Sequence, residues 1–304
     1  MFAVSSSVIR NPVVRVALSA AMVASVAPAQ AELMIGLTNN ALVFFDSASP
    51  ASASAPIAVT GLAAGSTLIG FDVRPTTGVP YAVANDGAIY ALNGATGAAT
   101  MIGVVAGGIP GGSGVGIDFN PVPDLAGQAS LRITTTASNV RFNVNPGSIG
   151  TTVDGNINGA TTFLDGLAYT NNDRDPATGT MLFGIGGGNL YQVTTPNAGT
   201  SVLIGSLGVT SLVGATGFDV SALTGASYAS LTNAASGLSS FYTVDLTSGA
   251  ATLVGAFGAN VGLVRDITAF AQAPPVAAIP EPETYAMMLL GLAGIGWAAR
   301  RRRR

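Results

Sequence analysis

The feature that most constrains this fold is a short pattern that recurs about every 50 residues. Four strand-like stretches begin with glycine, GFDV at 70–73, GIDF at 116–119, GLAY at 166–169 and GFDV at 217–220. Their starting points are separated by 46, 50 and 51 residues (70 to 116, 116 to 166, 166 to 217). A repeat of this length predicts a chain built from similar supersecondary units.

A second pattern follows inside the units. The segment YALNGATGAATMIG at Tyr90 recurs as YTVDLTSGAATLVG at Tyr242, and YQVTTPNAGTSVLIG at Tyr191 has one inserted residue. Each copy alternates apolar and polar residues, turns at a glycine and alternates again, and this pattern indicates a β-hairpin. A further strand precedes each hairpin, in one case joined by the favoured turn Asp86-Gly87. Four strands per unit are typical of a β-propeller blade.

The two ends of the repeat region complete one more unit. Residues 34–37, 41–45 and 57–60 have the pattern of the last three strands of a blade, and 264–270 has the pattern of a first strand. We therefore expect an all-β propeller of five four-stranded blades, closed between its N- and C-terminal strands, which removes two exposed edges. A β-sandwich is the alternative, but it gives no reason for the period.

The amino-acid composition excludes several kinds of catalytic and binding site. The 304 residues include no Cys, no His and no Lys, and charged residues make up 9%. Cysteine and histidine nucleophiles, zinc sites, Schiff-base lysines and phosphate-binding loops are excluded. Between residues 32 and 279, five arginines stand against 13 acidic residues. A nucleic-acid partner is not expected, because such binding depends on neutralising phosphates with basic groups.

Residues 1–31 have the order of a secretory signal peptide. Arg10 and Arg15 precede an apolar run at 16–27, and Ala29 and Ala31 occupy the −3 and −1 positions of a cleavage site. We expect export through the Sec machinery and cleavage by signal peptidase after Ala31. An N-terminal core helix is the alternative, which Pro28 disfavours.

The other end of the chain has three parts after a linker at 272–279. Pro280, Glu281 and Pro282 precede an uncharged run at 285–299, which is followed by Arg300, Arg301, Arg302, Arg303 and Arg304. A helix over 285–299 would rise about 22 Å, which is short for a bilayer core of about 30 Å. We expect a marginal transmembrane helix with the arginine tail as its cytoplasmic stop.

This tripartite end, at residues 279–304, resembles the PEP-CTERM sorting domain of Gram-negative bacteria. The resemblance implies processing by an exosortase, an inner-membrane-anchored precursor, and delivery to the cell surface or the exopolysaccharide matrix. An ordinary membrane anchor is the alternative. Residues 33–270, with the opening GFDVRP and the turn ATGAAT, also look like an uncharacterised bacterial repeat domain often seen in PEP-CTERM proteins. That likeness implies the propeller fold and no activity.

Carboxylates are the main candidates for chemistry in the body at 32–271. Asp72, Asp118 and Asp219 occupy one repeat position, Asp266 lies near it, and Ala168 interrupts the series. A cation in the central channel is one hypothesis. The favoured hypothesis is a structural role, in which each carboxylate accepts hydrogen bonds from backbone N–H groups of a loop. A buried carboxylate must be hydrogen-bonded, paired with an opposite charge or bound to a metal.

A second candidate is the loop at 171–179. Asn171, Asp173 and Asp175 place oxygen atoms at alternate positions, as calcium loops do, and predict a Ca²⁺ site. The loop lacks the bidentate Glu and the central Gly of an EF-hand. A turn rich in Asn, Asp and Pro is the alternative.

The sequence thus predicts an exported, non-catalytic propeller that binds or scaffolds at the cell surface or in the exopolysaccharide matrix. Exopolysaccharide or a surface protein is the expected partner, and no cofactor is expected apart from the Ca²⁺ of the loop at 171–179. The first alternative is a carboxylate-dependent hydrolase of extracellular polysaccharide, which needs two acids converging in one pocket beside aromatic rings. The single tryptophan, Trp297, lies in the tail. A structural protein without a ligand is the second alternative.

Overall fold

The computed structural model describes residues 31–110, 114–209 and 216–270. Ala29, the linker, the sorting motif with Pro280, Glu281 and Pro282, and the arginine tail lie outside the described residues, so those expectations remain predictions. Helix is sparse in the described part, which contains one 3₁₀ turn, η1 (Pro50–Ser52), and one short helix, α1 (Pro121–Leu125). Neither has the length or hydropathy that crossing a bilayer requires.

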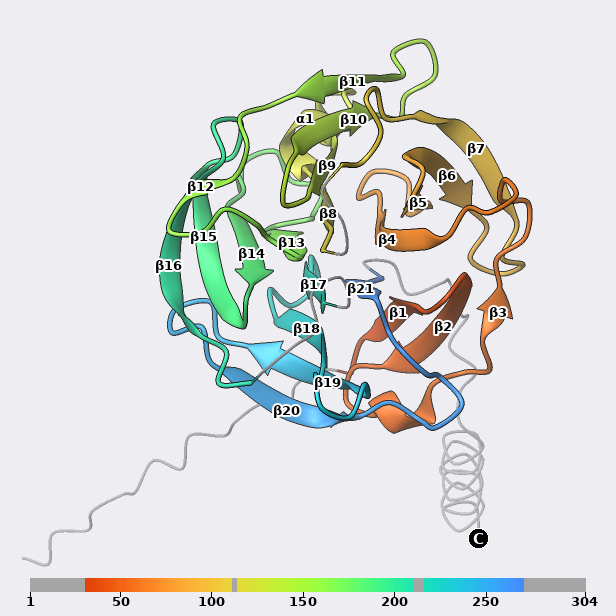
Figure 1. Ribbon diagram of the computed structural model, residues 1–304, viewed down its shortest axis with the longest axis vertical. Helices are drawn as coiled ribbons and strands as arrows, with labels where there is room; N and C mark the ends of the chain where they lie inside the picture. The colour runs from red at the N-terminus through yellow and green to blue at the C-terminus, as the bar shows by residue number, and fades with distance from the viewer. Residues whose placement is uncertain (1–30, 111–113, 210–215, 271–304) are drawn as a thin grey trace, which may run out of the picture. The chain divides into compact units, whose positions relative to one another are not determined.

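Five sheets, antiparallel except for one short added strand, are arranged around a common centre, as the propeller prediction required (Figure 1). Each is numbered here as a blade, from its inner strand outward. Blade 1 is β21 (Asp266–Ala269), β1 (Leu33–Leu37), β2 (Ala41–Asp46) and β3 (Ile57–Ala58). Blade 2 is β4 (Leu68–Val73), β5 (Pro80–Ala84), β6 (Ala88–Leu92) and β7 (Ala99–Val104). Blade 3 is β8 (Gly116–Phe119), β9 (Leu131–Thr134), β10 (Asn139–Asn143) and β11 (Gly150–Val153).

The remaining two blades follow the same plan. Blade 4 is β13 (Gly166–Tyr169), β14 (Leu182–Gly186), β15 (Asn189–Thr195) and β16 (Thr200–Ser206), with β12 (Asn158–Gly159) added at its outer edge. Blade 5 is β17 (Thr216–Val220), β18 (Ser227–Thr232), β19 (Ser239–Val244) and β20 (Ala251–Ala256). All four glycine-led stretches form inner strands.

Blade 1 closes the ring with strands from both ends of the repeat region. Strand β21 pairs with β1 in antiparallel register, from Met34 opposite Ala269 to Leu37 opposite Asp266. The N–H of Phe270 also donates to the carbonyl of Leu33 at 2.9 Å. The predicted closure is confirmed.

The repeated glycines let neighbouring inner strands approach one another. A Cβ atom on Gly217 would lie 2.6 Å from the backbone N of Ile267, and one on Gly116 would lie 2.7 Å from Cγ of Leu167. Real Cβ contacts are not this short, so a side chain would force the blades apart. At Gly116 and Gly217, glycine is therefore required by the packing of one blade on the next.

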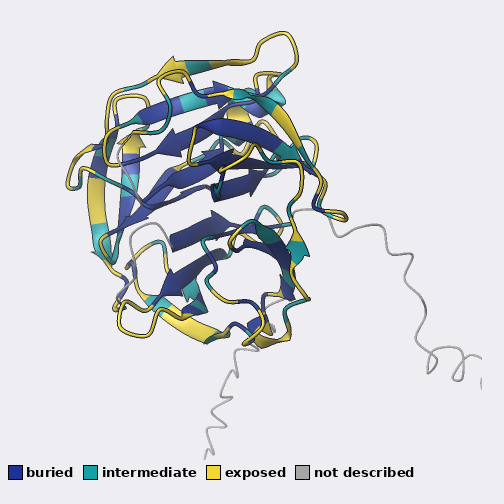
Figure 2. Ribbon diagram, turned by 45° about the vertical axis from the view of Figure 1, so that its right-hand side comes forward, coloured by how far each residue is buried: buried dark blue, intermediate teal, exposed yellow. Residues whose placement is uncertain are grey.

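Burial decreases from the centre outward (Figure 2). All residues of β8 and β13 are buried, whereas β20 and β11 are mostly exposed. Apolar side chains fill the space between blades; Phe45 of blade 1, for example, meets Phe241 of blade 5 edge to face with ring centroids 5.1 Å apart. The inner strands are rich in apolar residues because neighbouring blades cover both of their faces.

Strand β12 is a departure from the expected four strands per blade. It pairs in parallel with β16, with Asn158 opposite Thr200. The chain that leaves the outer strand of blade 3 runs along the outer edge of blade 4 before it enters β13. The corresponding connection from blade 1 to blade 2 forms one parallel bridge with the outer edge of blade 2, between Thr60 and Ala98.

A buried arginine joins blades 3 and 4. Arg132 of β9 is 1% exposed, and its Nε donates to the hydroxyl of Tyr169 at 2.8 Å. Its other nitrogens donate to Asn139, Asp154, the Pro196 carbonyl and Asn197. Because every side of the guanidinium is hydrogen-bonded, its burial is tolerated.

Candidate functional site at one end of the central channel

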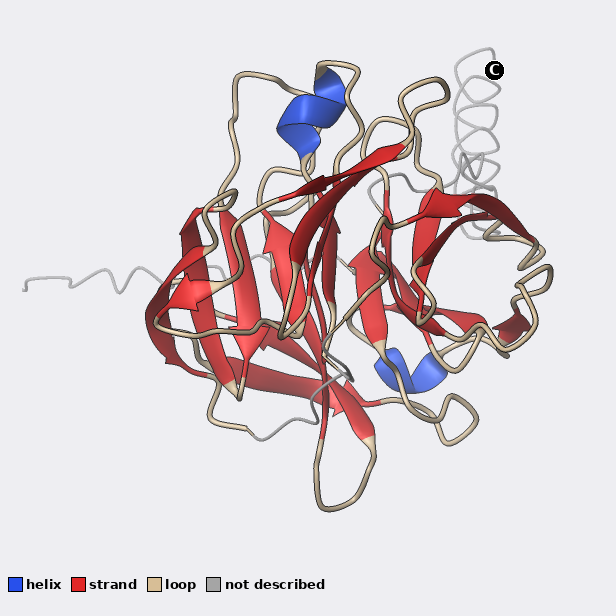
Figure 3. Ribbon diagram, turned by 45° about the horizontal axis from the view of Figure 1, so that its top comes forward, coloured by secondary structure: helices blue, strands red, loops and turns tan. Residues whose placement is uncertain are grey.

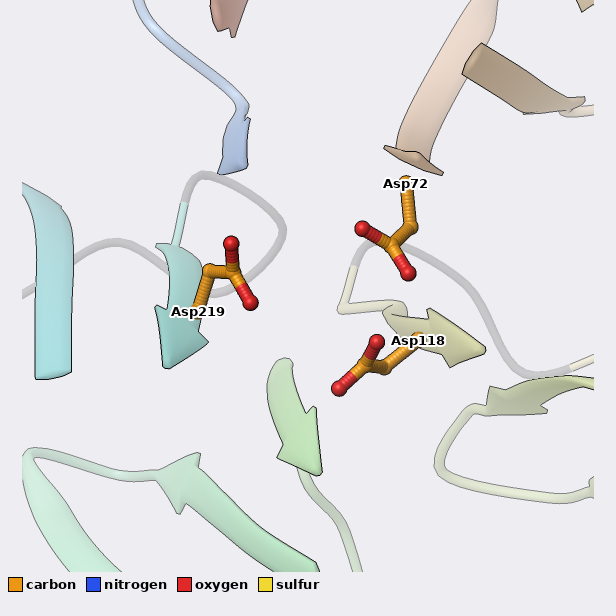
Figure 4. A group of neighbouring side chains, drawn as sticks. All are labelled: Asp72, Asp118 and Asp219. Carbon is orange, nitrogen blue, oxygen red and sulfur yellow. The ribbon is translucent and has the colours of Figure 1, made fainter. Parts of the chain in front are cut away.

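Three buried carboxylates converge at the centre of the ring. Asp72 from β4, Asp118 from β8 and Asp219 from β17 point toward one another in Figure 4. One oxygen from each lies within 4.8 Å of the other two, and the residues are 4%, 1% and 4% exposed. The shared repeat position therefore brings these side chains together, as the sequence predicted.

Each carboxylate bonds to the inner strand of the next blade. Asp72 Oδ2 accepts the N–H of Phe119 at 2.8 Å. Asp118 Oδ2 accepts the N–H of Tyr169, and Asp219 Oδ2 accepts the N–H of Ala269. The carboxylates thus hold neighbouring blades together, through strand amides rather than the loop amides that the sequence suggested.

The closing blade differs from the others at this level. Thr268 occupies the repeat position of the aspartates, and its hydroxyl donates to Asp72 Oδ1 at 2.9 Å. Asp266 stands two residues earlier, at the place of the repeated glycine, and its Oδ2 accepts the N–H of Phe71 at 2.9 Å. Asp266 therefore links blade 1 to blade 2 outside the three-carboxylate group, and Ala168 leaves blade 4 without a carboxylate at the repeat position.

The electrostatics of the cluster are unfavourable for three ionised groups. Burial, and then the charge of Asp72, raise the pKa of Asp118 well above its usual value. The same two causes raise the pKa of Asp219 to about 7. Among the described residues, the arginine ion pairs are with Asp124 and Asp154, and none is with Asp72, Asp118 or Asp219.

A cavity of about 260 Å³ opens beside the cluster, at the end of the inner strands. Four blades contribute to it through these strand ends and the loops that follow them. Its lining includes the carboxylates Asp72 and Asp219, the loop residues Asn172, Asp173 and Arg174, and the apolar residues Pro75, Leu223 and Phe270.

The loop predicted to bind Ca²⁺ forms part of the cavity rim. Asp173 Oδ1 accepts the N–H of Asp175 at 2.8 Å, Asp175 Oδ1 accepts the N–H of Ala177 at 2.9 Å, and Asn171 donates to the carbonyl of Thr178. These are the bonds of turns rich in Asn and Asp. Calcium binding by Asn171, Asp173 and Asp175 remains a prediction.

Asn172 is a cavity residue that the sequence did not single out as a candidate ligand. Asn171 has φ of 54°, and this left-handed conformation precedes the side chain that lines the cavity. Asn172 is 9% exposed, and its Oδ1 has no hydrogen-bond partner. The signal in the sequence was the Asn-Asn pair, because Asn tolerates positive φ better than most residues.

Solved structures show limited similarity to this chain. A chain in the crystal structure of a nidogen/laminin complex has a TM-score of 0.47 and 11% identity, over 80% of this chain and 100% of that one. A structural genomics protein of unknown function from Bacteroides thetaiotaomicron VPI-5482 has a TM-score of 0.47 and 16% identity, over 80% of this chain and 65% of that one. No curated protein matches.

Family models match both parts of the chain. The PEP-CTERM protein-sorting motif matches residues 278–304. This motif marks an exported protein that an exosortase processes and whose precursor is anchored in the membrane. The Domain of unknown function (DUF4394) matches residues 41–268, which is more than half of the chain, and the chain therefore belongs to that family.

Proposed function

We propose that the propeller is a non-catalytic binding module at the cell surface or in the exopolysaccharide matrix, and that the cavity beside the central channel receives one sugar unit of the exopolysaccharide. The observation that carries the proposal is the cavity itself, which combines hydrogen-bonding groups with an apolar wall. Concave sites with a few convergent polar groups are the usual places for small ligands.

The lining suits a sugar. Asp173 and Asn172 offer oxygen acceptors for hydroxyl groups, and Arg174 offers donors. Phe270 and Leu223 provide an apolar surface for the C–H face of a ring. At about 260 Å³ the space is small, so it suits one unit of a polymer rather than a long segment.

A carboxylate-dependent hydrolase is the second candidate, because Asp72 and Asp219 both line the cavity. Burial, with the charge of Asp72, raises the pKa of Asp219 to about 7, as a general acid requires. Against this, both oxygens of Asp219 already accept backbone N–H groups, from Val220 and Ala269. We therefore favour binding without hydrolysis.

The test uses the mature exported protein and exopolysaccharide purified from the producing organism. Binding is measured by isothermal titration calorimetry, and the chain length of the polymer is followed by size-exclusion chromatography. Ala222→Trp places a large side chain in the cavity lining and should weaken binding at least tenfold. Polymer length should stay constant.

Ala235→Trp is the matched control. Ala235 is exposed in the loop between β18 and β19, at the opposite end of blade 5 from the β17–β18 loop that carries Ala222. It should bind like the parent. Equal binding by the Ala222→Trp variant, or binding only to a surface protein, would remove the carbohydrate proposal, and shortening of the polymer would favour the hydrolase.

A further inference from the structure

We propose that Asp72, Asp118 and Asp219 form a binding site for one Ca²⁺ ion in the central channel of the propeller. This inference is independent of the proposed sugar site, because it rests on the carboxylate cluster and does not require any polymer to bind. It also differs from the calcium loop predicted at Asn171, Asp173 and Asp175.

The spacing of the carboxylates fits a single ion. One oxygen from each lies within 4.8 Å of the other two. Calcium binds oxygen at 2.3–2.6 Å, so two ligand atoms on one ion are at most about 5 Å apart. The three strands that carry these residues belong to blades 2, 3 and 5, and Figure 4 shows their carboxylates facing a common point.

Two unsatisfied oxygen atoms point to a missing partner. Asp118 Oδ1 is fully buried and receives no hydrogen bond from an N–H or hydroxyl group, while its Oδ2 accepts the N–H of Tyr169. The Asp118 carboxyl group lies within hydrogen-bonding reach of Asp72, so either a shared proton or a cation could satisfy this oxygen. Asn172 Oδ1 is also buried and unpartnered, and Asn172 lines the same cavity as Asp72 and Asp219. Buried polar atoms in folded proteins are normally satisfied, so each of these calls for a partner that donates or carries positive charge.

Among the described residues, no arginine forms an ion pair with the cluster; Arg174 lines the same cavity, but its Nε donates to the Pro75 carbonyl at 3.4 Å. The ion pairs of the described residues join Arg74, Arg132 and Arg141 to other aspartates. The donors that reach the cluster are backbone N–H groups and the Thr268 hydroxyl. They bond both oxygens of Asp72 and of Asp219 but only Oδ2 of Asp118, and each carboxylate keeps at least one further lone pair for a cation. An all-oxygen, carboxylate-rich set is the ligand chemistry of a hard divalent cation, and the cavity beside it gives the ion a way in.

The experiment titrates Ca²⁺ into mature exported protein from which metal has been removed with a chelator. Isothermal titration calorimetry should give one site per chain, and saturating Ca²⁺ should raise Tm by on the order of 5 °C at a 100-fold excess over Kd. Asp118→Asn keeps an acceptor for the Tyr169 N–H but removes one charge. It should weaken Ca²⁺ binding at least tenfold.

The double substitution of Asp173→Asn with Asp175→Asn tests the neighbouring loop as the alternative Ca²⁺ site. The matched control is Asp245→Asn, which removes an exposed carboxylate from the β19–β20 turn, outside the cavity lining. Both variants should bind Ca²⁺ like the parent. Two results would overturn the proposal: no heat of binding and no change in Tm for the parent, or loss of binding in the loop variant alone. If the parent does not respond to Ca²⁺ and Asp118→Asn without Ca²⁺ has the higher Tm, the carboxyl groups share protons instead.

Discussion

Asp165 is a buried carboxyl group that takes no part in the channel cluster. It precedes β13, is 1% exposed, and its Oδ2 accepts a hydrogen bond from the Thr216 hydroxyl at 3.4 Å, while its Oδ1 has no partner. Burial is the main cause that raises the pKa of Asp165 to about 7. A neutral carboxyl is thus preferred in the folded state.

The raised pKa of Asp165 predicts a specific pH dependence. Between about pH 4 and pH 7 the folded chain retains a proton that the unfolded chain has released, so this group makes the protein less stable as pH rises. Asp165→Asn removes the titration. The variant should be close to the parent at pH 4 and more stable above pH 7, by up to about 4 kcal/mol at 1.36 kcal/mol per pKa unit.

Urea unfolding of parent and Asp165→Asn across this pH range measures the difference directly. Other buried acids titrate in both proteins and cancel in the comparison. A stability difference that does not change with pH would contradict the assignment.

Individual site residues were only partly predictable. The three channel aspartates share a repeat position, so the alignment of repeats placed them together. Thr268 was not predicted, because the closing strand has no leading glycine that fixes its alignment with the other repeats. Asp266, the nearest acidic residue, was placed near the repeat position instead. Asn172 was not predicted, because only Asn171, Asp173 and Asp175 match the alternate spacing of a calcium loop.

The inner strands depend on glycine at the contact between blades. Gly217→Ala should destabilise the protein by about 1–3 kcal/mol, because the new Cβ would lie 2.6 Å from the backbone N of Ile267 and cannot move aside. Gly150→Ala in β11 is the matched control. It meets nothing within 4 Å, so its effect should stay within about 1 kcal/mol and could be stabilising.

Thermal or urea unfolding of the two alanine variants and the parent measures these differences in stability. Equal stabilities would mean that the blades can separate to admit a methyl group, contrary to the close approach described for β17 and β21.

Elements with a strong pattern were predictable, and those without one were not. Inner strands and hairpins carry a glycine start and period-two alternation, so the five sheets followed from the sequence. Strand β12 is two residues long, Asn158 and Gly159, and has no alternation to detect. It forms because the connection between blades passes along the edge of β16, which only the assembled fold determines.

At the scale of the molecule, closure through β21 should control cooperativity. Deleting residues 264–270 removes the inner strand of blade 1, which pairs with β1 and carries the Asp266 and Thr268 bonds to blade 2. We expect Tm to fall by on the order of 10 °C or more, or the single transition to be lost. Differential scanning calorimetry of the mature protein gives both quantities.

Deletion of the predicted linker at 272–279 is the control for this experiment and should leave Tm unchanged. A 264–270 deletion that melts cooperatively at the parent temperature would show that the ring does not depend on its closing strand.

The sorting motif makes a prediction about maturation. Pro280 and Pro282 lack N–H groups and should keep Glu281 extended, where a protease can reach it. Substituting all three with Ala should leave export intact while full-length precursor accumulates in the inner membrane. Substituting Arg300 to Arg304 with Ser should instead weaken the stop, so that some precursor passes the membrane uncleaved.

Cell fractionation and immunoblotting separate these two defects. A triple-alanine protein that still reaches the parent size and surface location would show that the three residues are not needed for processing.

The most direct test of the whole account is a crystal structure of the mature protein with an oligosaccharide from the organism's own exopolysaccharide. The account predicts five blades closed by β21, with one sugar unit in the cavity contacting Asn172 or Arg174 and lying against Phe270. Its glycosidic bonds should be intact. A sugar bound on another face, an empty cavity at saturating oligosaccharide, or a cleaved product beside Asp219 would contradict the proposal of a non-catalytic carbohydrate-binding propeller.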